Sequence, residues 1–148
     1  MRLPAALAIV TALGLVAPFA MADTYTSCRG WQVDSTTRQL PPCPDRPNCV
    51  TGRWALPGPV SVSALLAAID AEPRSRIELV GEHILVASFR SRLFGFVDEA
   101  VFLLSPTGEV DYRSSACSGY YDFGVNQRRM SRVADRLART TVANPDNR

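Results

Sequence analysis

The sequence predicts a two-layer α+β domain, in which a roughly four-stranded antiparallel sheet packs against two helices behind a disulfide-stapled N-terminal arm. Two observations carry this prediction. Four short segments in the second half of the chain are joined by tight turns, and strands connected in this way run antiparallel. A segment with helical periodicity stands on each side of them, so that both helices can cover one face of the sheet.

The chain begins like a secretory signal peptide. Arg2 is followed by an apolar run that ends in Ala20-Met21-Ala22, which is a typical cleavage pattern. The run is too short to be a convincing membrane span. We therefore expect residues 1–22 to be cleaved and the protein to be periplasmic or secreted, with no transmembrane segment in the mature chain. An uncleaved N-terminal anchor and a lipid anchor at Cys28 are the weaker alternatives.

The charge balance excludes one class of partner. The 148 residues contain 16 Lys+Arg and 14 Asp+Glu, so the formal net charge is +2. Domains that bind nucleic acid carry a far more basic surface than this. We expect no nucleic-acid partner, and the length is that of a single domain.

Residues 23–59 form the expected arm, which is rich in Pro, Gly and Thr and has no sustained periodicity. An even number of cysteines in an exported chain predicts disulfides, and four cysteines allow about three connectivities. We favour Cys43–Cys49, because the prolines between these residues bend the loop that the bridge would close. Cys28 would then pair with Cys117 and tie the arm to the last strand.

Other uses of the cysteines have less support. The spacing between Cys43 and Cys49 is not a standard zinc spacing, and His83 is the one histidine in the chain. A redox centre of the thioredoxin type would need a Cys-x-x-Cys motif, which the sequence lacks. We therefore expect no metal and no cofactor.

Residues 60–140 should form the body of the same domain. Its first helix begins near Ser61, which can cap it, and ends before Pro73. The segments that follow alternate as strands do. We expect these strands at residues 76–80, 83–90, 96–104 and 109–116. The last helix should run from about residue 125 to about residue 139, and residues 141–148 should fray.

The densest polar stretch lies where the last strand gives way to the last helix. Six residues from this stretch and from the strand before it could form a ligand site: Asp98, Arg113, Ser114, Asp122, Asn126 and Arg129. Guanidinium groups, a hydroxyl and a helix N-terminus together could hold an anion. The alternative is structural, with an aspartate pairing with an arginine to fix the corner. Because side chains alternate along a strand, Arg113 should point away from the face that carries Ser114.

Support for catalysis is thin. A serine triad would need His83, which stands at a predicted strand start beside a turn, and the Gly-x-Ser-x-Gly elbow is absent. Phosphate-loop and dinucleotide fingerprints are absent as well. A hydrolase would have to use Asp98 or Asp122 with Ser114 or water. We expect a non-enzymatic protein and keep the hydrolase as the alternative.

Three stretches of the sequence resemble the domain of unknown function 1499 family. They are CPDRPNCV at 43–50, FVDEAVF at 96–102 and YRSSACSGYYDFGVNQRRM at 112–130. The family motifs read Cys-Pro-x-x-Pro-Asn-Cys-Val, then Phe-x-Asp-Asp, then Arg-Ser-x-Ser-Arg-x-Gly-x-x-Asp-x-Gly-x-Asn-x-x-Arg. The order and spacing agree over roughly residues 40–137.

The resemblance carries over residue by residue. The matching positions are Cys43, Pro44, Pro47, Asn48, Cys49, Val50, Asp98, Arg113, Ser114, Gly119, Asp122, Gly124, Val125, Asn126 and Arg129. Glu99 stands in place of the second aspartate. The main departure is Ala116-Cys117, where the family usually has Ser-Arg, and this fits a bridge from Cys117 to Cys28 that is particular to this branch.

The resemblance implies export or membrane association but supplies no activity. Our first hypothesis is therefore an exported cell-envelope protein that binds a small anionic or amphipathic ligand, or an envelope protein, near the six candidate residues. A hydrolase is the second hypothesis. A thiol–disulfide factor that uses Cys43 and Cys49 is the third.

Overall fold

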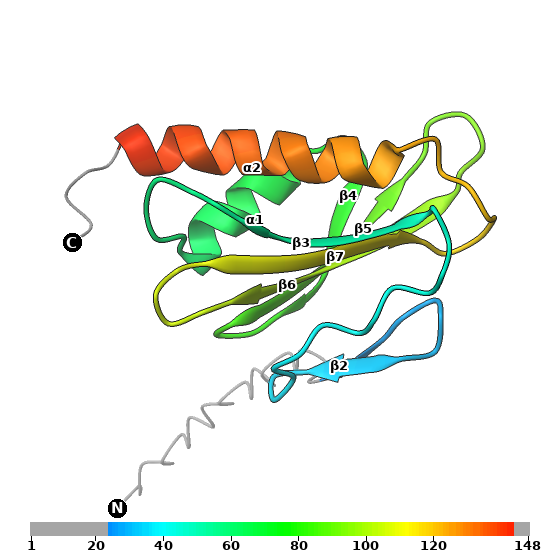
Figure 1. Ribbon diagram of the computed structural model, residues 1–148, viewed down its shortest axis with the longest axis horizontal. Helices are drawn as coiled ribbons and strands as arrows, with labels where there is room; N and C mark the ends of the chain where they lie inside the picture. The colour runs from blue at the N-terminus through cyan, green and yellow to red at the C-terminus, as the bar shows by residue number, and fades with distance from the viewer. Residues whose placement is uncertain (1–23, 144–148) are drawn as a thin grey trace, which may run out of the picture.

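The computed structural model describes residues 24–143, which form two helices, a two-stranded sheet and a five-stranded sheet (Figure 1). The expected signal peptide, residues 1–22, and the end of the expected tail, from residue 144, lie outside the described residues. Between residues 24 and 143, no helix is both long enough and apolar enough to cross a membrane.

The larger sheet confirms the predicted α+β class and is antiparallel throughout. The strand order is β3-β7-β6-β5-β4. The bounds are Cys49–Trp54 for β3, Ser75–Val80 for β4, Ile84–Arg90 for β5, Val97–Leu104 for β6 and Val110–Ala116 for β7. The four strands expected from alternation are all present within a residue of their predicted ends. The sheet has one strand more than expected.

The additional strand is β3, which the sequence analysis left in the arm as irregular chain. It pairs along its whole length with β7. Gly52 interrupts the sequence pattern that is typical of a strand. The reason for a glycine at this position lies on the neighbouring strand β7. A Cβ atom on Gly52 would lie 2.8 Å from the Tyr112 hydroxyl oxygen, so the ring of Tyr112 needs the space that glycine leaves. The neighbouring Trp54 ring packs against Tyr112 with a centroid distance of 5.0 Å.

Helices α1 (Val62–Asp70) and α2 (Val125–Ala143) cover one face of the sheet (Figure 1). Ser61 caps α1, because its Oγ accepts a hydrogen bond from the backbone nitrogen of Ala64 at 3.2 Å. The core between helices and sheet is built from large apolar side chains, among them Leu65, Ile69, Phe89, Phe102, Val133 and Leu137. The last helix is four residues longer than the sequence predicted.

The arm covers the other face of the sheet and adds a third layer. Its hairpin consists of β1 (Thr24–Thr26) and β2 (Gln32–Asp34), and Figure 1 shows β2 on the side of the sheet opposite to α2. A second apolar core lies beneath it, made of Val33, Leu79, Ile84, Val86, Val101 and Leu103. Both faces of the sheet are therefore buried.

Two disulfides hold the arm. Cys28 pairs with Cys117 across 89 residues of sequence, and Cys43 pairs with Cys49 across 6. This is the pairing that the proline-bent loop favours. The first bridge joins the arm to the residue that follows β7, and it occupies the sulfur that a lipid anchor at Cys28 would need.

Candidate functional site

Five of the six candidate residues gather on the helix-covered face, where β6 begins, β7 ends and α2 begins. We call this group the polar corner, and its members are Asp98, Ser114, Asp122, Asn126 and Arg129. All of them are buried except Asp122, which is half-buried. Strand pairing sets the position of Asp98, which lies opposite Ala116 in the register of β6 and β7.

Asn126 is the centre of the polar corner. Its Oδ1 atom accepts hydrogen bonds from Ser114 Oγ at 2.6 Å and from Arg129 Nη1 at 3.1 Å. The second guanidinium nitrogen of Arg129 donates to Asp98 Oδ2 at 2.9 Å. The guanidinium carbon also lies 4.4 Å from the centroid of the Phe89 ring, in cation–π geometry. Arg129 is thus held by a carboxylate, an amide and an aromatic face.

Asp122 caps the last helix. Its Oδ2 atom accepts from the backbone nitrogen and the Nδ2 atom of Asn126, both at 2.9 Å, and its Oδ1 atom accepts from the backbone nitrogen of Gly124 at 2.9 Å. Burial raises the pKa of Asp122, but these hydrogen bonds outweigh burial and hold the pKa below its usual range. An anion at this helix N-terminus would have to compete with the Asp122 carboxylate.

Asp98 differs from Asp122 in the direction in which its pKa is shifted. Burial raises the pKa of the Asp98 carboxyl, and the neighbouring Arg129 offsets only part of that effect. The Ser114 hydroxyl donates to an amide oxygen rather than to a base. The polar groups of the corner therefore satisfy one another, which agrees with the structural alternative and offers a hydrolytic mechanism no support.

The sixth candidate, Arg113, lies on the opposite face of the sheet, as the alternation of the last strand predicts. It is only 2% exposed. Its Nη1 atom donates to Ser115 Oγ at 2.9 Å, and its guanidinium carbon lies 5.1 Å from the centroid of the Trp31 ring. Burial lowers its pKa. Because the sheet separates Arg113 from Arg129, the two guanidinium groups do not share one anion site.

Glu99 is a buried carboxylate that the sequence analysis did not select. Its Oε1 atom accepts from the Tyr25 hydroxyl and from the backbone nitrogen of Cys28, the latter at 2.9 Å. Burial first, and then the Glu99 carboxylate, raise the pKa of the Tyr25 hydroxyl. The sequence did contain a signal for this role. Glu99 follows Asp98 directly in a predicted strand, so alternation places the Glu99 side chain on the face opposite to Asp98. Glu99 therefore fastens the arm to the sheet.

The same place brings together the one group of possible metal ligands within residues 24–143. The sulfurs of Cys28 and Cys117 and a carboxylate oxygen of Glu99 lie within 4.8 Å of one another. Both sulfurs belong to the disulfide, so the thiolates that a soft metal prefers are not available. Chemically, the group acts as a covalent and hydrogen-bonded clamp on the arm.

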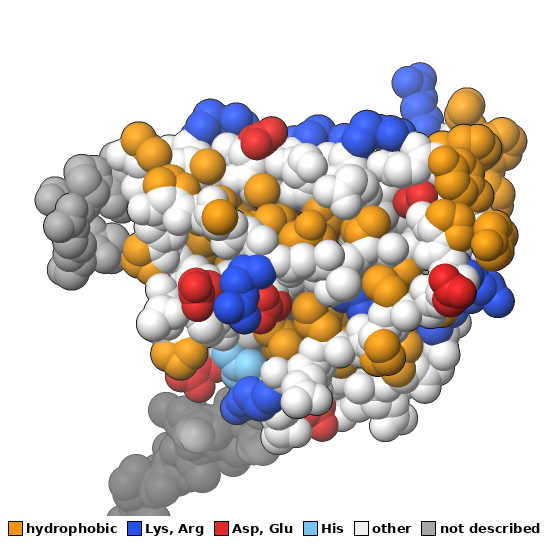
Figure 2. Space-filling model, viewed as in Figure 1, with side chains coloured by type: hydrophobic (Ala, Val, Ile, Leu, Met, Phe, Trp, Pro, Cys, Tyr) orange, Lys and Arg blue, Asp and Glu red, His pale blue; other side chains and the backbone are white. Residues whose placement is uncertain are grey.

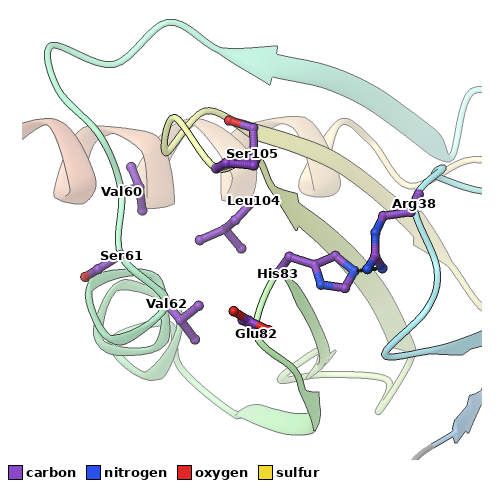
Figure 3. Close-up of a pocket in the computed structure, with 9 residues that line it drawn as sticks. Arg38, Val60, Ser61, Val62, Glu82, His83, Leu104 and Ser105 are labelled. Carbon is purple, nitrogen blue, oxygen red and sulfur yellow. Dashed lines mark hydrogen bonds between the residues drawn. The ribbon is translucent and has the colours of Figure 1, made fainter.

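A cavity of about 480 Å³ lies at the other end of the sheet (Figure 3). Val60, Val62 and Leu104 line one side of it, and the ring of His83 faces Arg38 on the other. His83 Nε2 also lies 3.0 Å from the carbonyl oxygen of Thr37. The lining contains none of the six candidate residues, and the histidine is engaged by the arm.

Two loops leave the sheet at the end where the polar corner lies. One connects β5 to β6 over residues 91–96, and the other connects β7 to α2 over residues 117–124. The backbone nitrogen of Cys117 donates to the carbonyl oxygen of Val97 at 2.9 Å, which holds the bases of the loops together. Six large apolar side chains on these loops are 56–84% exposed. They are Leu93, Phe94, Phe96, Tyr120, Tyr121 and Phe123.

We call these six residues the aromatic end. Figure 2 shows a concentration of hydrophobic side chains at the right-hand end of the molecule, where Figure 1 places the two loops. Phe94 contacts Phe96 with a centroid distance of 5.6 Å, and Tyr121 contacts Phe123 edge-on at 5.0 Å. Nothing local in the sequence connects the loop at 91–96 with the loop at 117–124, because the two are 20 residues apart in the chain.

Phe123 has a backbone conformation that is unfavourable for a bulky residue. Its φ angle is 54°, in the left-handed region where residues other than glycine are strained by about 1–3 kcal/mol. Asp122 fixes the chain on one side through Gly124, and Arg128 Nη1 donates to the carbonyl oxygen of Phe123 at 2.8 Å. Asp122 of the polar corner and the neighbouring Arg128 therefore hold an exposed ring in a strained position.

The proline-bent loop braces the same region. Asn48 is 1% exposed, and its Nδ2 atom donates to the carbonyl oxygen of Gly119 at 2.7 Å. The backbone carbonyl oxygen of Asn48 accepts a hydrogen bond from the backbone nitrogen of Ala116 at 3.0 Å. The Cys43–Cys49 bridge closes the loop that carries Asn48. Three stretches that are distant in sequence thus meet at one end of the sheet.

Comparisons with known proteins give one match. No curated protein matches the chain, and no solved structure does. A family model matches residues 39–137, which include the polar corner, the aromatic end and the Cys43–Cys49 loop but leave out the β1–β2 hairpin. On this match the chain belongs to the family described as protein of unknown function (DUF1499).

Proposed function

We propose that this chain is an exported, non-catalytic binding protein of the cell envelope, and that it docks its partner through the aromatic end. The observation that carries the proposal is the exposure of six large apolar side chains on two adjacent loops. Contiguous apolar surface of this kind marks interaction sites in soluble domains. In this proposal the polar corner positions the docking surface and does not itself bind the partner.

The exposure is unfavourable for folding alone, which supports a functional reason for it. Burying a side chain the size of leucine or phenylalanine is worth about 1.5–3 kcal/mol, and Phe94 and Phe123 forgo most of that gain. Phe123 adds backbone strain, although asparagine or glycine would suit its φ angle of 54° better. A ring that is both strained and exposed fits a residue retained for contact.

Export has support of its own. All four cysteines of the chain are paired, and stable disulfides are characteristic of oxidising compartments. The apolar N-terminal stretch with its Ala-Met-Ala cleavage pattern points the same way. An envelope location would place the aromatic end near membranes and near other envelope proteins.

The experiment is site-specific photo-crosslinking in cells that express the full chain. A benzoylphenylalanine replaces Phe94 or Phe123, and the control carries it at Val142, which is 67% exposed near the far end of α2. We expect adducts from both loop positions after irradiation and none from position 142. Equal labelling at position 142, or labelling at neither loop position, would overturn the proposal.

A further inference from the structure

We propose that the partner of the aromatic end is the surface of an anionic lipid membrane, into which the two loop tips insert. The inference rests on the proposed function above and names the partner. It has three grounds, which are the shape of the surface, the charge around it and the rigidity of the loops.

The shape favours a soft surface over a rigid groove. Leu93, Phe94 and Phe123 are 84%, 74% and 76% exposed, so they stand out from the protein. Tyr120 and Tyr121 accompany them on the second loop, 66% and 57% exposed. Phenylalanine and leucine side chains enter the boundary between headgroups and acyl chains, and tyrosine prefers the headgroup level. The composition of the tips matches both depths of the membrane interface.

The charge on the two loops and their flanks is positive. The stretches 90–97 and 117–128 contain Arg90, Arg92 and Arg128, all exposed, and a single acidic residue, Asp122. The carboxylate of Asp122 is turned inward to cap α2. Each exposed arginine near a membrane of anionic lipid contributes about a fivefold gain in binding. The arginines therefore complement anionic headgroups.

Two of these arginines are attached to the loops that they flank. Arg90 Nη1 donates to the carbonyl oxygen of Gly95 at 3.4 Å, and Arg128 Nη1 donates to that of Phe123 at 2.8 Å. Each loop thus carries a cation next to its apolar tip. A headgroup phosphate could contact the guanidinium while the neighbouring ring enters the membrane.

The loops are held in shape before binding. In the first loop the backbone nitrogen and carbonyl oxygen of Phe96 bond to Ser91 Oγ and to the Ser91 backbone nitrogen, at 2.9 and 2.8 Å. The second loop is fixed by Asp122 and by Asn48, as described above. Fixed loops lose little conformational entropy when they bind, which raises the affinity of a small apolar surface.

The test is co-sedimentation of the processed protein, whose N-terminus is established by intact mass, with vesicles. One set contains equal parts of phosphatidylcholine and phosphatidylglycerol, and the other contains phosphatidylcholine alone. We expect binding to the anionic set that is at least about tenfold tighter than to the neutral set. The variant F94S/F123N should lose at least about tenfold in affinity for the anionic vesicles, since it removes two inserted rings.

Asparagine suits the left-handed φ of position 123, so F123N should keep the fold, and circular dichroism and thermal unfolding check this directly. The variant R92Q should bind about fivefold more weakly. The matched controls V142S and R139Q change an exposed apolar residue and an exposed arginine of α2 away from the loops, and should bind as the wild type does.

Three outcomes would overturn the membrane proposal. The first is that the wild type does not bind anionic vesicles. The second is that V142S loses as much vesicle affinity as F94S/F123N does, and the third is that the affinity is the same for anionic and neutral vesicles. If positions 94 and 123 cross-link to a protein and the chain does not bind vesicles, the membrane proposal is refuted and the proposed docking function stands. Absence of cross-links at both loop positions would refute the proposed function itself.

Discussion

The two faces of the central sheet each bury one carboxylate and one arginine, but they treat these charges differently. On the helix face, Asp98 and Arg129 form a direct ion pair at 2.9 Å. On the arm face, Glu99 bonds to the arm, while Arg113 bonds to Ser115 and lies over the Trp31 ring. The Nε atom of Arg113 has no hydrogen-bond partner among residues 24–143.

The difference follows from what covers each face. Helix α2 brings its own arginine to the carboxylate, so the helix-face pair belongs to the body of the domain. The arm brings a tyrosine hydroxyl and a backbone nitrogen to Glu99, so the carboxylate on that face depends on the arm staying in place. A buried charge is tolerated only with partners, whether they are opposite charges or hydrogen-bond donors. Four predictions test this contrast, in order of decreasing effect.

Removal of the bridge between arm and sheet should have the largest effect. The variant C28A/C117A frees a chain that the disulfide closes over 89 residues, and it should lose about 4 kcal/mol in the free energy of unfolding. Urea unfolding measures the loss, and hydrogen exchange should show faster exchange of residues 24–34. The variant C43A/C49A, which opens a loop of 6, should lose about 2 kcal/mol and leave the hairpin protected. An unchanged hairpin in C28A/C117A would show that the apolar core alone holds the arm.

Replacing Arg129 should cost more stability than replacing Asp98, its partner on the helix face. The variant R129M removes the donors to Asp98 and Asn126 and leaves a buried carboxylate, so it should lose about 3 kcal/mol at neutral pH. Because burial already raises the pKa of Asp98, the carboxyl can take up a proton, and the loss should shrink as the solution becomes acidic. D98N alone should be milder, and D98N/R129M should recover part of the loss in a double-mutant cycle. An R129M loss that is independent of pH would contradict this account of Asp98.

Glu72 is a third buried carboxylate, and it differs from Asp98 and Glu99 because its two arginine partners are partly exposed. It follows α1 and accepts hydrogen bonds from Arg132 Nη2 at 2.7 Å and from Arg136, both on α2. Burial raises the pKa of Glu72, but the two arginines outweigh burial and hold the pKa of this carboxyl below its usual range. We expect E72Q to lose about 1–2 kcal/mol at neutral pH.

The pH dependence of E72Q has a definite sign. A carboxyl whose pKa is lowered by folding stabilises the protein above its unfolded pKa, and this contribution disappears as the pH falls through the folded pKa. The difference between wild type and E72Q should therefore close in acid, as the pH falls through the lowered pKa of Glu72, in urea titrations at a series of pH values. A difference that stays constant into acid would mean that packing, rather than charge, makes Glu72 stabilising.

The smallest effect should come from the arm-face arginine. Within residues 24–143 the buried guanidinium of Arg113 has no direct ion pair, and the variant R113M replaces it by an apolar side chain of similar length. We expect the free energy of unfolding to stay within about 1 kcal/mol of the wild-type value, because the lost contacts are offset by the removed desolvation of the charge. A loss as large as that of R129M would remove the contrast between the two faces.

Much of the fold could be predicted from the chain. Alternation and turn residues locate β4 to β7, and the apolar stripes locate both helices, because these signals are local and periodic. The disulfide pairing also followed from a local feature, the bent loop between Cys43 and Cys49. Strand β3 was not predicted, because the reason for its glycine is not local. The ring of Tyr112, on strand β7, needs the space that Gly52 leaves.

The candidate site was predicted only in part. The sequence selected all five members of the polar corner. Four of them lie in the polar stretch where the last strand gives way to the last helix, which is a local signal, and Asp98 comes from the strand before it. It also grouped Arg113 with them, although alternation placed that side chain on the other face. It did not find Glu99 or Asn48 as bracing residues, since their partners come from segments tens of residues away.

By itself, then, the sequence determined the elements and their order, the charged residues that had to be paired, and the cysteines that could staple the arm. The tertiary structure alone decided which charges meet, that the arm covers the second face, and that loops 91–96 and 117–124 present their aromatic side chains together. The physical reason is that periodicity and capping act over a few residues, whereas strand pairing and burial join residues that the chain keeps far apart.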